Sequence, residues 1–230
     1  MKKQPEIIAI DGPAASGKST LAEKLAEALG YLYFDTGVMY RAATLAALNT
    51  FHHVDDEEQV SLLTENLQID VRPPSKKDGR KYDVISAGED ITWQIRSPEV
   101  DANVSVVSAY SRVRKALTAQ QRRIGQRGRV VMVGRDIGTV VLPEADLKIY
   151  LEASTEERAR RRFLEQAERN GKLSYDEILK AMIRRDQIDS SRAIAPMQPA
   201  DDALILCSDG MTADEVFKKV LKLVRLNSEP

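Results

Sequence analysis

The chain alternates short apolar runs with longer segments whose apolar residues recur at helical spacing. The apolar runs predict buried β-strands at residues 6–10, 31–34, 130–133, 147–151 and 203–206. The helical spacing predicts α-helices at residues 19–29, 38–49, 55–66, 98–127, 154–169, 174–192 and 212–226. Because strands and helices alternate, we expect an α/β fold with a mostly parallel central sheet that helices cover on both faces.

Residues 67–97 interrupt this alternation. Apolar and polar residues alternate one by one in Leu67–Val71 and again in Tyr82–Ile85, which is the period of a β-strand. The segment between them, PPSKKDGRK, is rich in turn-forming residues, and a turn centred on Gly88 follows. These features predict a small antiparallel β insert within the larger fold.

The composition is typical of a globular protein, with 230 residues of which 43% are hydrophobic and 30% are charged. No apolar run approaches the ~20 residues of a membrane-spanning helix, and the first residues do not resemble a secretory signal. The single cysteine, Cys207, excludes an intrachain disulfide and is expected to be a buried small hydrophobe. The two histidines, His52 and His53, are adjacent, which argues against a Ser-His-Asp triad or a multi-histidine metal site. We therefore expect a cytoplasmic protein with no membrane partner.

The net charge of −1 conceals three segments of different charge. Residues 1–111 carry a net charge of −6, residues 112–192 carry +7 and residues 193–230 carry −2. A basic segment of this kind is typical of solvated helix surfaces, of nucleic-acid-binding proteins and of sites for small anions. The charge alone does not choose among these three interpretations.

A glycine-rich loop stands between the first predicted strand and the first predicted helix. Residues 12–19, GPAASGKS, match the pattern G-x-x-x-x-G-K-[ST] of a phosphate-binding loop, or P-loop. Glycines there let backbone N–H groups surround an anion, and the N-terminus of the helix adds partial positive charge. Lys18 can reach the β- and γ-phosphates, and the Ser19 hydroxyl can bind Mg²⁺. The residues expected to hold ATP or GTP are Gly12, Pro13, Ala14, Ala15, Ser16, Gly17, Lys18, Ser19 and Thr20.

Charged residues beside glycine follow two other predicted strands, in residues 35–41 and 134–139. Because ligands bind beyond the carboxyl ends of parallel strands, we expect ligand contacts in both segments. Further along, Arg185, Asp189 and Arg192 are spaced to share one face of a helix. Arginine suits bidentate phosphate contacts and aspartate suits sugar hydroxyls, although an exposed ion pair within the helix is the alternative interpretation.

A second group of arginines lies in a predicted helix between two loops. Arg158, Arg161 and Arg162 fall within two helical turns of one another. Such a segment can close over a triphosphate as a lid. A solvated basic helix stays open as the alternative.

Several strings, taken in order along the chain, resemble the bacterial-type cytidylate kinases within the nucleoside monophosphate kinases. They are IDGPAASGKST, YFDTGVMYRA, VSAYSRVRKAL, GRDIGTVVLPEADLKIYLEAS and RRDQIDSSRAIAPMQPADDALIL. They cover most of the chain, and GRDIGTVV is far more specific than the P-loop. The resemblance implies a three-layer P-loop kinase. Its implied parts are a core of residues 1–66, 98–153 and 173–230, a β insert at 67–97 in the monophosphate-binding region, and a helical lid at 154–172.

The resemblance also implies an activity, the Mg²⁺-dependent transfer of the γ-phosphoryl group from ATP to CMP or dCMP. The implied catalytic residues are Lys18, Arg41, Arg135, Arg158, Arg162 and Arg192. The implied substrate-binding residues are Thr36, Tyr40, Arg41, Ser105, Arg114, Arg135, Asp136, Arg185, Asp189 and Arg192. Among them, Ser105, Arg114 and Asp136 resemble the cytosine contacts, and Arg185 and Asp189 resemble the ribose contacts. Ser19 is the implied metal contact, and no acid is assigned to Mg²⁺ because Val133 stands where relatives often carry one.

Two other functions remain as hypotheses from the residues. A P-loop kinase for another acceptor, such as UMP, needs the same donor site, whereas an alcohol acceptor would need a general base. A nucleic-acid-binding ATPase would use the basic segment, and its binding would weaken steeply with salt. The arginines stand beside glycine turns without an RNA-binding signature, so we expect small nucleotides and no nucleic acid as partners. With no large apolar surface run, we also expect a monomer.

Overall fold

The computed structural model describes residues 4–168, 173–192 and 194–226. Internal contacts divide the chain into two compact units. The first unit contains residues 1–29 and 131–230, and the second contains residues 30–130. Within the described ranges, no helix is long and apolar enough to cross a membrane.

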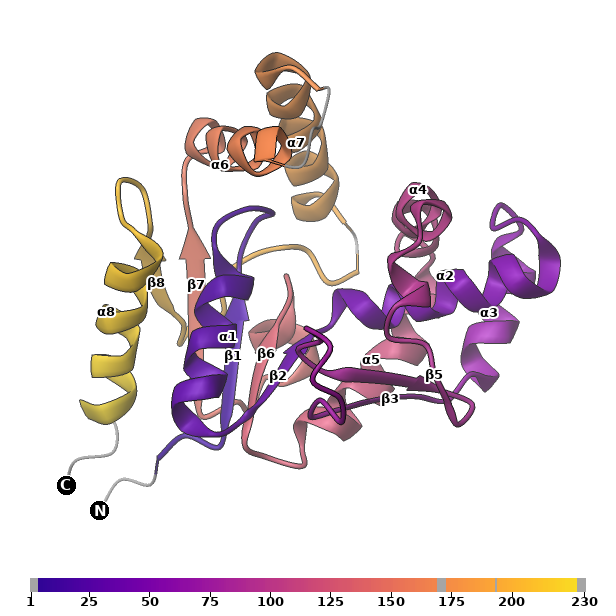
Figure 1. The fold of residues 1–230 in the computed structure, drawn as a ribbon, viewed down its shortest axis with the longest axis horizontal. Helices are drawn as coiled ribbons and strands as arrows, with labels where there is room; N and C mark the ends of the chain where they lie inside the picture. The colour runs from indigo at the N-terminus through magenta and orange to yellow at the C-terminus, as the bar shows by residue number, and fades with distance from the viewer. Residues whose placement is uncertain (1–3, 169–172, 193, 227–230) are drawn as a thin grey trace. The chain divides into compact units, whose positions relative to one another are not determined.

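The main sheet has the strand order β2-β6-β1-β7-β8 in the described residues (Figure 1). Its strands are β1 (Ile7–Asp11), β2 (Leu32–Asp35), β6 (Val130–Val133), β7 (Leu147–Glu152) and β8 (Leu204–Cys207). Strand β7 pairs in parallel with β1, with Ile8 opposite Leu147, and in parallel with β8, with Ile149 opposite Leu204. The expected α/β fold with a parallel central sheet is confirmed.

Most helices of the first unit follow the carboxyl end of a strand, and α7 follows α6. They are α1 (Lys18–Leu29), the π-helical turn η2 (Ile137–Val141), α6 (Thr155–Glu168), α7 (Tyr175–Ser190) and α8 (Ala213–Leu226). Lys24 of α1 and Asp214 of α8 form an ion pair at 2.9 Å, and these two helices lie side by side (Figure 1). Helices α6 and α7 pack through a small apolar cluster of Ala159, Ile178 and Met182. The helices of the first unit thus pack in two pairs, α1 with α8 and α6 with α7.

The second unit combines helices with the predicted antiparallel insert. Its helices are α2 (Gly37–Phe51), α3 (Glu57–Asn66), the 3₁₀ turn η1 (Gln94–Arg96), α4 (Pro98–Val107) and α5 (Ser111–Gly125). The insert is a sheet of order β3-β4-β5, made of β3 (Ile69–Arg72), β4 (Asp83–Ser86) and β5 (Glu89–Asp90). Both of its strand pairs are antiparallel, as predicted.

The single helix predicted for residues 98–127 is wrong, because the chain forms α4 and α5 there. No glycine or proline marks the break. Instead, Ala109 and Tyr110 donate their N–H groups three residues back, to Val106 and Val107, which tightens the end of α4. Tyr110 is extended, and its hydroxyl donates to the Val54 carbonyl at 2.8 Å, so a tertiary contact separates the helices. The predicted helix stop at Asn170 and Gly171 lies outside the described residues.

The prediction of a buried Cys207 is also wrong, because this side chain is exposed. Strand β8 is the last in the sheet order, and three of its four residues are exposed. Ile205, for example, is 60% exposed. The apolar run forms the predicted strand, but this strand lies at the edge of the sheet. Its residues are exposed because no further strand lies beside it in the described residues.

Candidate functional site

The P-loop connects β1 to α1 and has the backbone that an anion site needs. Gly12 has a φ of +140°, and a Cβ there would lie 2.1 Å from the Leu151 carbonyl oxygen. Only glycine can occupy this position without displacing β7. Gly17 has a φ of +96° and Ala15 a φ of +60°. These positive φ values let the backbone of the loop turn around its centre.

Lys18 begins α1 and turns its side chain back over this loop. Its Nζ donates to the Pro13 carbonyl at 2.5 Å and to Ser16 Oγ at 3.4 Å, and the residue is only 8% exposed. Ser19 and Thr20 on the first turn of the helix are exposed. A buried cation and exposed hydroxyls at a helix N-terminus fit a triphosphate, because each offers a donor or positive charge to phosphate oxygens.

Asp11 is a site residue that the sequence-based predictions omit. It ends β1 directly before the P-loop and is 5% exposed. Its two carboxylate oxygens accept the N–H groups of Ile137 at 2.8 Å and Gly138 at 2.7 Å, at the start of η2. Burial raises the pKa of Asp11 to about 6. The nearby charge of Asp136 also raises this pKa, whereas the two hydrogen bonds and the charge of Lys18 lower it. A carboxylate that ends an apolar strand before a glycine is the signal that could have found it.

Three of the predicted arginines lie around the carboxylate of Asp189 on α7. The carboxylate is 3% exposed and forms ion pairs with Arg135 and Arg192, and Arg185 Nε lies 3.9 Å from it. The helical spacing predicted that Arg185, Asp189 and Arg192 share a helix face, but α7 ends at Ser190, so Arg192 approaches Asp189 from beyond the helix. Arg135 comes from the end of β6. One carboxylate among three guanidinium groups leaves net positive charge for an anionic ligand.

Two arginines of α6 contact the P-loop. Arg158 is 3% exposed; its guanidinium pairs with Asp186 of α7 and donates to the Ala14 carbonyl at 3.2 Å. Arg161 donates to the Ser16 carbonyl at 3.3 Å and to the Ser208 carbonyl at 2.6 Å. The predicted catalytic Arg162 instead pairs with Glu165 at 2.9 Å and is half exposed.

A cavity of about 160 Å³ lies beside the P-loop in the first unit. Polar atoms of Ser16, Thr20 and Ser208 share its lining with the apolar side chains of Met211 and Val216. Ser208 Oγ donates to the Ser16 carbonyl at 3.2 Å, which ties the loop before α8 to the P-loop. A mixed lining of this kind suits the flat, partly apolar base of a nucleotide.

The second unit holds the other predicted substrate contacts. Thr36 is buried before α2, and Arg114 is 6% exposed with its guanidinium 5.6 Å from the centre of the Tyr40 ring. Arg41 donates to the Ile95 carbonyl at 3.1 Å and pairs with Asp101. Ser105 of α4 is exposed. The structure therefore gathers Arg41, Tyr40 and Arg114 on the neighbouring helices α2 and α5, with Ser105 on α4.

The described residues contain no group of three or more His, Cys, Asp or Glu side chains that could hold a metal ion. A hydroxyl at the P-loop fits an ion that brings phosphate oxygens and water as its other ligands, which is how Mg²⁺ commonly binds. The donor set is therefore compatible with Mg²⁺ that arrives with a nucleotide.

A P-loop on a parallel sheet, a buried lysine and arginines from α6 and α7 define the class of P-loop phosphotransferases. The profile of the family described as "Cytidylate kinase" matches residues 8–226. The chain therefore belongs to the cytidylate kinase family.

Individual relatives agree with this assignment over nearly their whole lengths. The chain is 56% identical to a cytidylate kinase of Chloroflexus aggregans, covering 94% of this chain and 93% of that protein. It is 48% identical to one from Herpetosiphon aurantiacus (98% and 96% covered) and 44% identical to one from Bacillus licheniformis (94% and 95%). A solved structure of an uncharacterized protein from Eubacterium ventriosum shares the fold, with a TM-score of 0.51, 11% identity and 95% and 98% covered.

Proposed function

We propose that this chain transfers the γ-phosphoryl group of ATP to CMP or dCMP, with Mg²⁺, and releases ADP and the nucleoside diphosphate. The observation that carries the proposal is the intact P-loop with buried Lys18, in a chain that matches the cytidylate kinase family over residues 8–226.

The donor nucleotide is assigned to the first unit. The triphosphate lies along the P-loop, where backbone N–H groups and Lys18 neutralise its charge. The base lies in the neighbouring cavity between Thr20 and Met211. Arg158 and Arg161 hold the loop from the lid side, so movement of α6 would change their contacts with the P-loop and with the phosphates.

The acceptor needs binding and orientation, and it needs no general base. Its phosphate is already an anion, so the barrier comes from bringing two anions into line and from charge on the transferred group. Arg41, Arg135 and Arg192 supply positive charge for this purpose. Asp189 and Arg185 are assigned to the ribose. Ser105, Arg114 and Asp136 are assigned to the cytosine edge, which offers one amine donor and two acceptors.

Ser19 would hold Mg²⁺ through its hydroxyl, together with phosphate oxygens. When bound, the ion neutralises part of the phosphate charge during transfer. The orientation of the phosphates by Lys18 and the P-loop N–H groups does not depend on a further side-chain ligand.

A coupled assay of ADP release tests the proposal across CMP, dCMP, UMP, AMP, GMP and shikimate. We expect the highest kcat/KM with CMP or dCMP. Fastest turnover of AMP or shikimate would contradict the proposal, and fastest turnover of UMP would favour the second kinase hypothesis. We also propose that the chain acts as a monomer without nucleic acid, which sedimentation velocity with and without RNA checks.

Asp136→Ala is expected to raise the KM for CMP about 10- to 100-fold, because a lost base-edge contact costs about 1–3 kcal/mol. The KM for ATP should change less than twofold. The matched control is Asp176→Ala, an exposed carboxylate on α7, which should leave both values unchanged. An equal rise in both KM values would remove Asp136 from cytosine recognition.

A further inference from the structure

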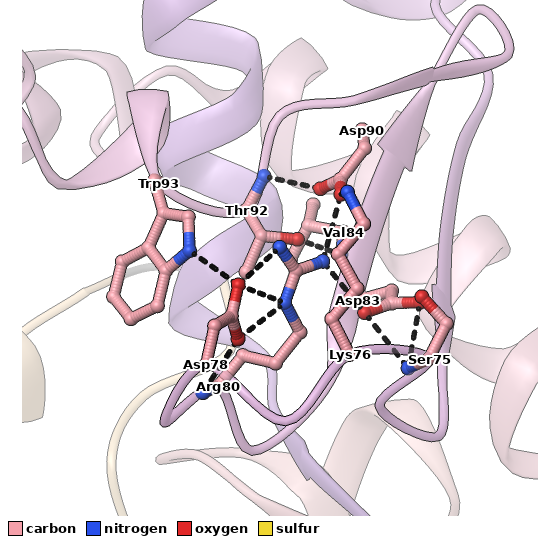
Figure 2. Close-up of polar contacts among 9 residues, drawn as sticks. All are labelled: Ser75, Lys76, Asp78, Arg80, Asp83, Val84, Asp90, Thr92 and Trp93. Carbon is pink, nitrogen blue, oxygen red and sulfur yellow. Dashed lines mark hydrogen bonds and ion pairs between the residues drawn. The ribbon is translucent and has the colours of Figure 1, made fainter.

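The loop between β3 and β4 is organised around one buried arginine (Figure 2). The side chain of Arg80 is 3% exposed and forms ion pairs with three carboxylates. Its Nη2 lies 2.8 Å from Asp78, and its Nη1 lies 2.9 Å from Asp83 and 2.7 Å from Asp90. We call these four residues the Arg80 cluster. Because it joins the loop, β4 and β5, it holds the insert together at the point where β5 ends.

Each carboxylate of the Arg80 cluster also accepts a hydrogen bond from outside the cluster. Asp83 accepts the N–H of Ser75 at 3.1 Å, Asp90 accepts the N–H of Thr92 at 3.1 Å, and Asp78 accepts the indole Nε1–H of Trp93 at 3.1 Å. The bonds from Arg80 hold the pKa of Asp78 well below its usual range, so this carboxylate is ionised at neutral pH. Two of these three bonds lead to the segment that follows β5.

That segment passes directly into the turn η1. Thr92 Oγ1 accepts the N–H of Val84 at 2.9 Å, which fixes the start of the segment on β4. The Arg96 guanidinium lies 5.7 Å from the centre of the Trp93 ring and donates to the Tyr82 hydroxyl at 3.1 Å. The Arg80 cluster therefore holds Thr92 and Trp93, the two residues directly before η1, and Trp93 in turn lies against Arg96 at the end of the turn.

Turn η1 in turn holds Arg41. The Ile95 carbonyl at the centre of η1 accepts a hydrogen bond from Arg41 Nη1 at 3.1 Å. The same nitrogen pairs with Asp101 on α4, a helix capped by Ser97 directly after η1. About a third of the Arg41 side chain stays exposed, so the guanidinium keeps nitrogens for a ligand. Arg41 is thus oriented by groups that the insert positions.

We propose that Arg80 is a positioning residue for the acceptor phosphate site. It acts through the Arg80 cluster, Trp93 and η1 to hold the guanidinium of Arg41, and it does not touch the nucleotide itself. The inference rests on the proposed function in assigning the acceptor phosphate to Arg41. Stability alone does not explain the arrangement, because the cost of removing these charges from water can exceed the energy of their attraction.

The experiment compares Arg80→Met with the matched control Arg72→Met. Arg72 lies in the same insert, its side chain is 59% exposed, and its Nε pairs with Asp70 at 2.9 Å. Steady-state kinetics would give KM for CMP and for ATP. We expect Arg80→Met to raise the KM for CMP about tenfold, an energy of about 1.4 kcal/mol, with the KM for ATP and kcat within twofold. Arg72→Met should behave as the wild type.

Trp93 supplies a second readout that does not depend on turnover. It is the only tryptophan in the chain, and it is 48% exposed. CMP should change its fluorescence more than cytidine, which lacks the phosphate, and Arg80→Met should abolish the difference. If Arg80→Met fails to fold, Trp93→Phe removes only the indole donor to Asp78, and a smaller rise in the KM for CMP alone is expected.

Equal changes in both KM values, or no change in either, would overturn the role of Arg80. The same holds if Arg72→Met reproduces the effect. A failure of the proposed function has a different signature, because the wild type would then prefer another acceptor. The comparison of KM values, made with that preferred acceptor in place of CMP, would still support or overturn the role of Arg80.

Discussion

Lys18→Met is expected to lower kcat/KM about 10³-fold, the upper end of the loss seen when one transition-state donor is removed. Lys18 is buried beside the P-loop and its Nζ donates to the Pro13 carbonyl. In the proposed reaction it donates to the phosphates of ATP instead. Methionine keeps the length and the apolar stem and removes only the charge. The measurement is the rate of ADP release with saturating Mg²⁺.

The fold should tolerate this substitution, because replacing a buried charge with an apolar group of similar volume is often neutral or stabilising. Urea unfolding monitored by Trp93 fluorescence checks this. Lys24→Met is the control on the same helix, since Lys24 is an exposed partner of Asp214. It should keep wild-type activity. A Lys18→Met enzyme with more than a tenth of wild-type activity would contradict a role of Lys18 in phosphoryl transfer.

Asp11→Asn is expected to change how stability depends on pH. The folded pKa of Asp11, about 6, lies above its ordinary value of 3.8, so between these values the folded state binds more protons than the unfolded state. The wild type therefore loses stability as pH rises from about 4 to about 7. The loss attributable to this group is about 3 kcal/mol, because each pKa unit corresponds to about 1.4 kcal/mol.

Asparagine does not ionise, so the stability of Asp11→Asn relative to the wild type should rise over the same range. Urea unfolding at several pH values, without nucleotide, measures it. At low pH the variant is expected to be the less stable protein, because an amide accepts only one of the N–H groups of Ile137 and Gly138. Asp214→Asn is the control: Lys24 holds the pKa of Asp214 below its ordinary value, so this carboxylate is ionised in both states at neutral pH, and its replacement should leave the pH dependence of stability between about pH 5 and 7 unchanged. If the free energies of unfolding of Asp11→Asn and the wild type differ by the same amount at every pH, burial does not raise the pKa of Asp11.

Local sequence predicted the elements that depend on neighbouring residues. The P-loop was predicted from eight consecutive residues, because its strand, glycines and helix lie within one stretch of chain. The antiparallel insert was predicted from two segments of alternating apolar and polar residues and from the turns around them. Its strand pairs are antiparallel, and the structure adds the short strand β5. Helical spacing predicted that Arg185 and Asp189 share a helix face, and on α7 Arg185 Nε lies 3.9 Å from the Asp189 carboxylate.

Contacts between residues far apart in the sequence could not be predicted from local sequence patterns. Arg135 joins Asp189 across 54 positions of sequence, and Arg158 reaches the Ala14 carbonyl across 144. The helices of residues 98–127 separate because Tyr110 bonds to Val54, a residue with no local signal. Among the arginines of α6, spacing did not distinguish Arg161, which contacts the P-loop, from Arg162, which pairs with Glu165.

The sequence by itself determined the class of this protein, its alternating elements and the loop for the donor phosphates, because these depend on short-range pattern and backbone conformation. The tertiary structure decided which charges are buried and which carboxylate each arginine contacts. Burial raises the pKa of Asp11, and the Arg80 cluster holds the turn beside Arg41. Both effects arise because side chains far apart in sequence share an environment with little water, where a charge is costly unless partners surround it.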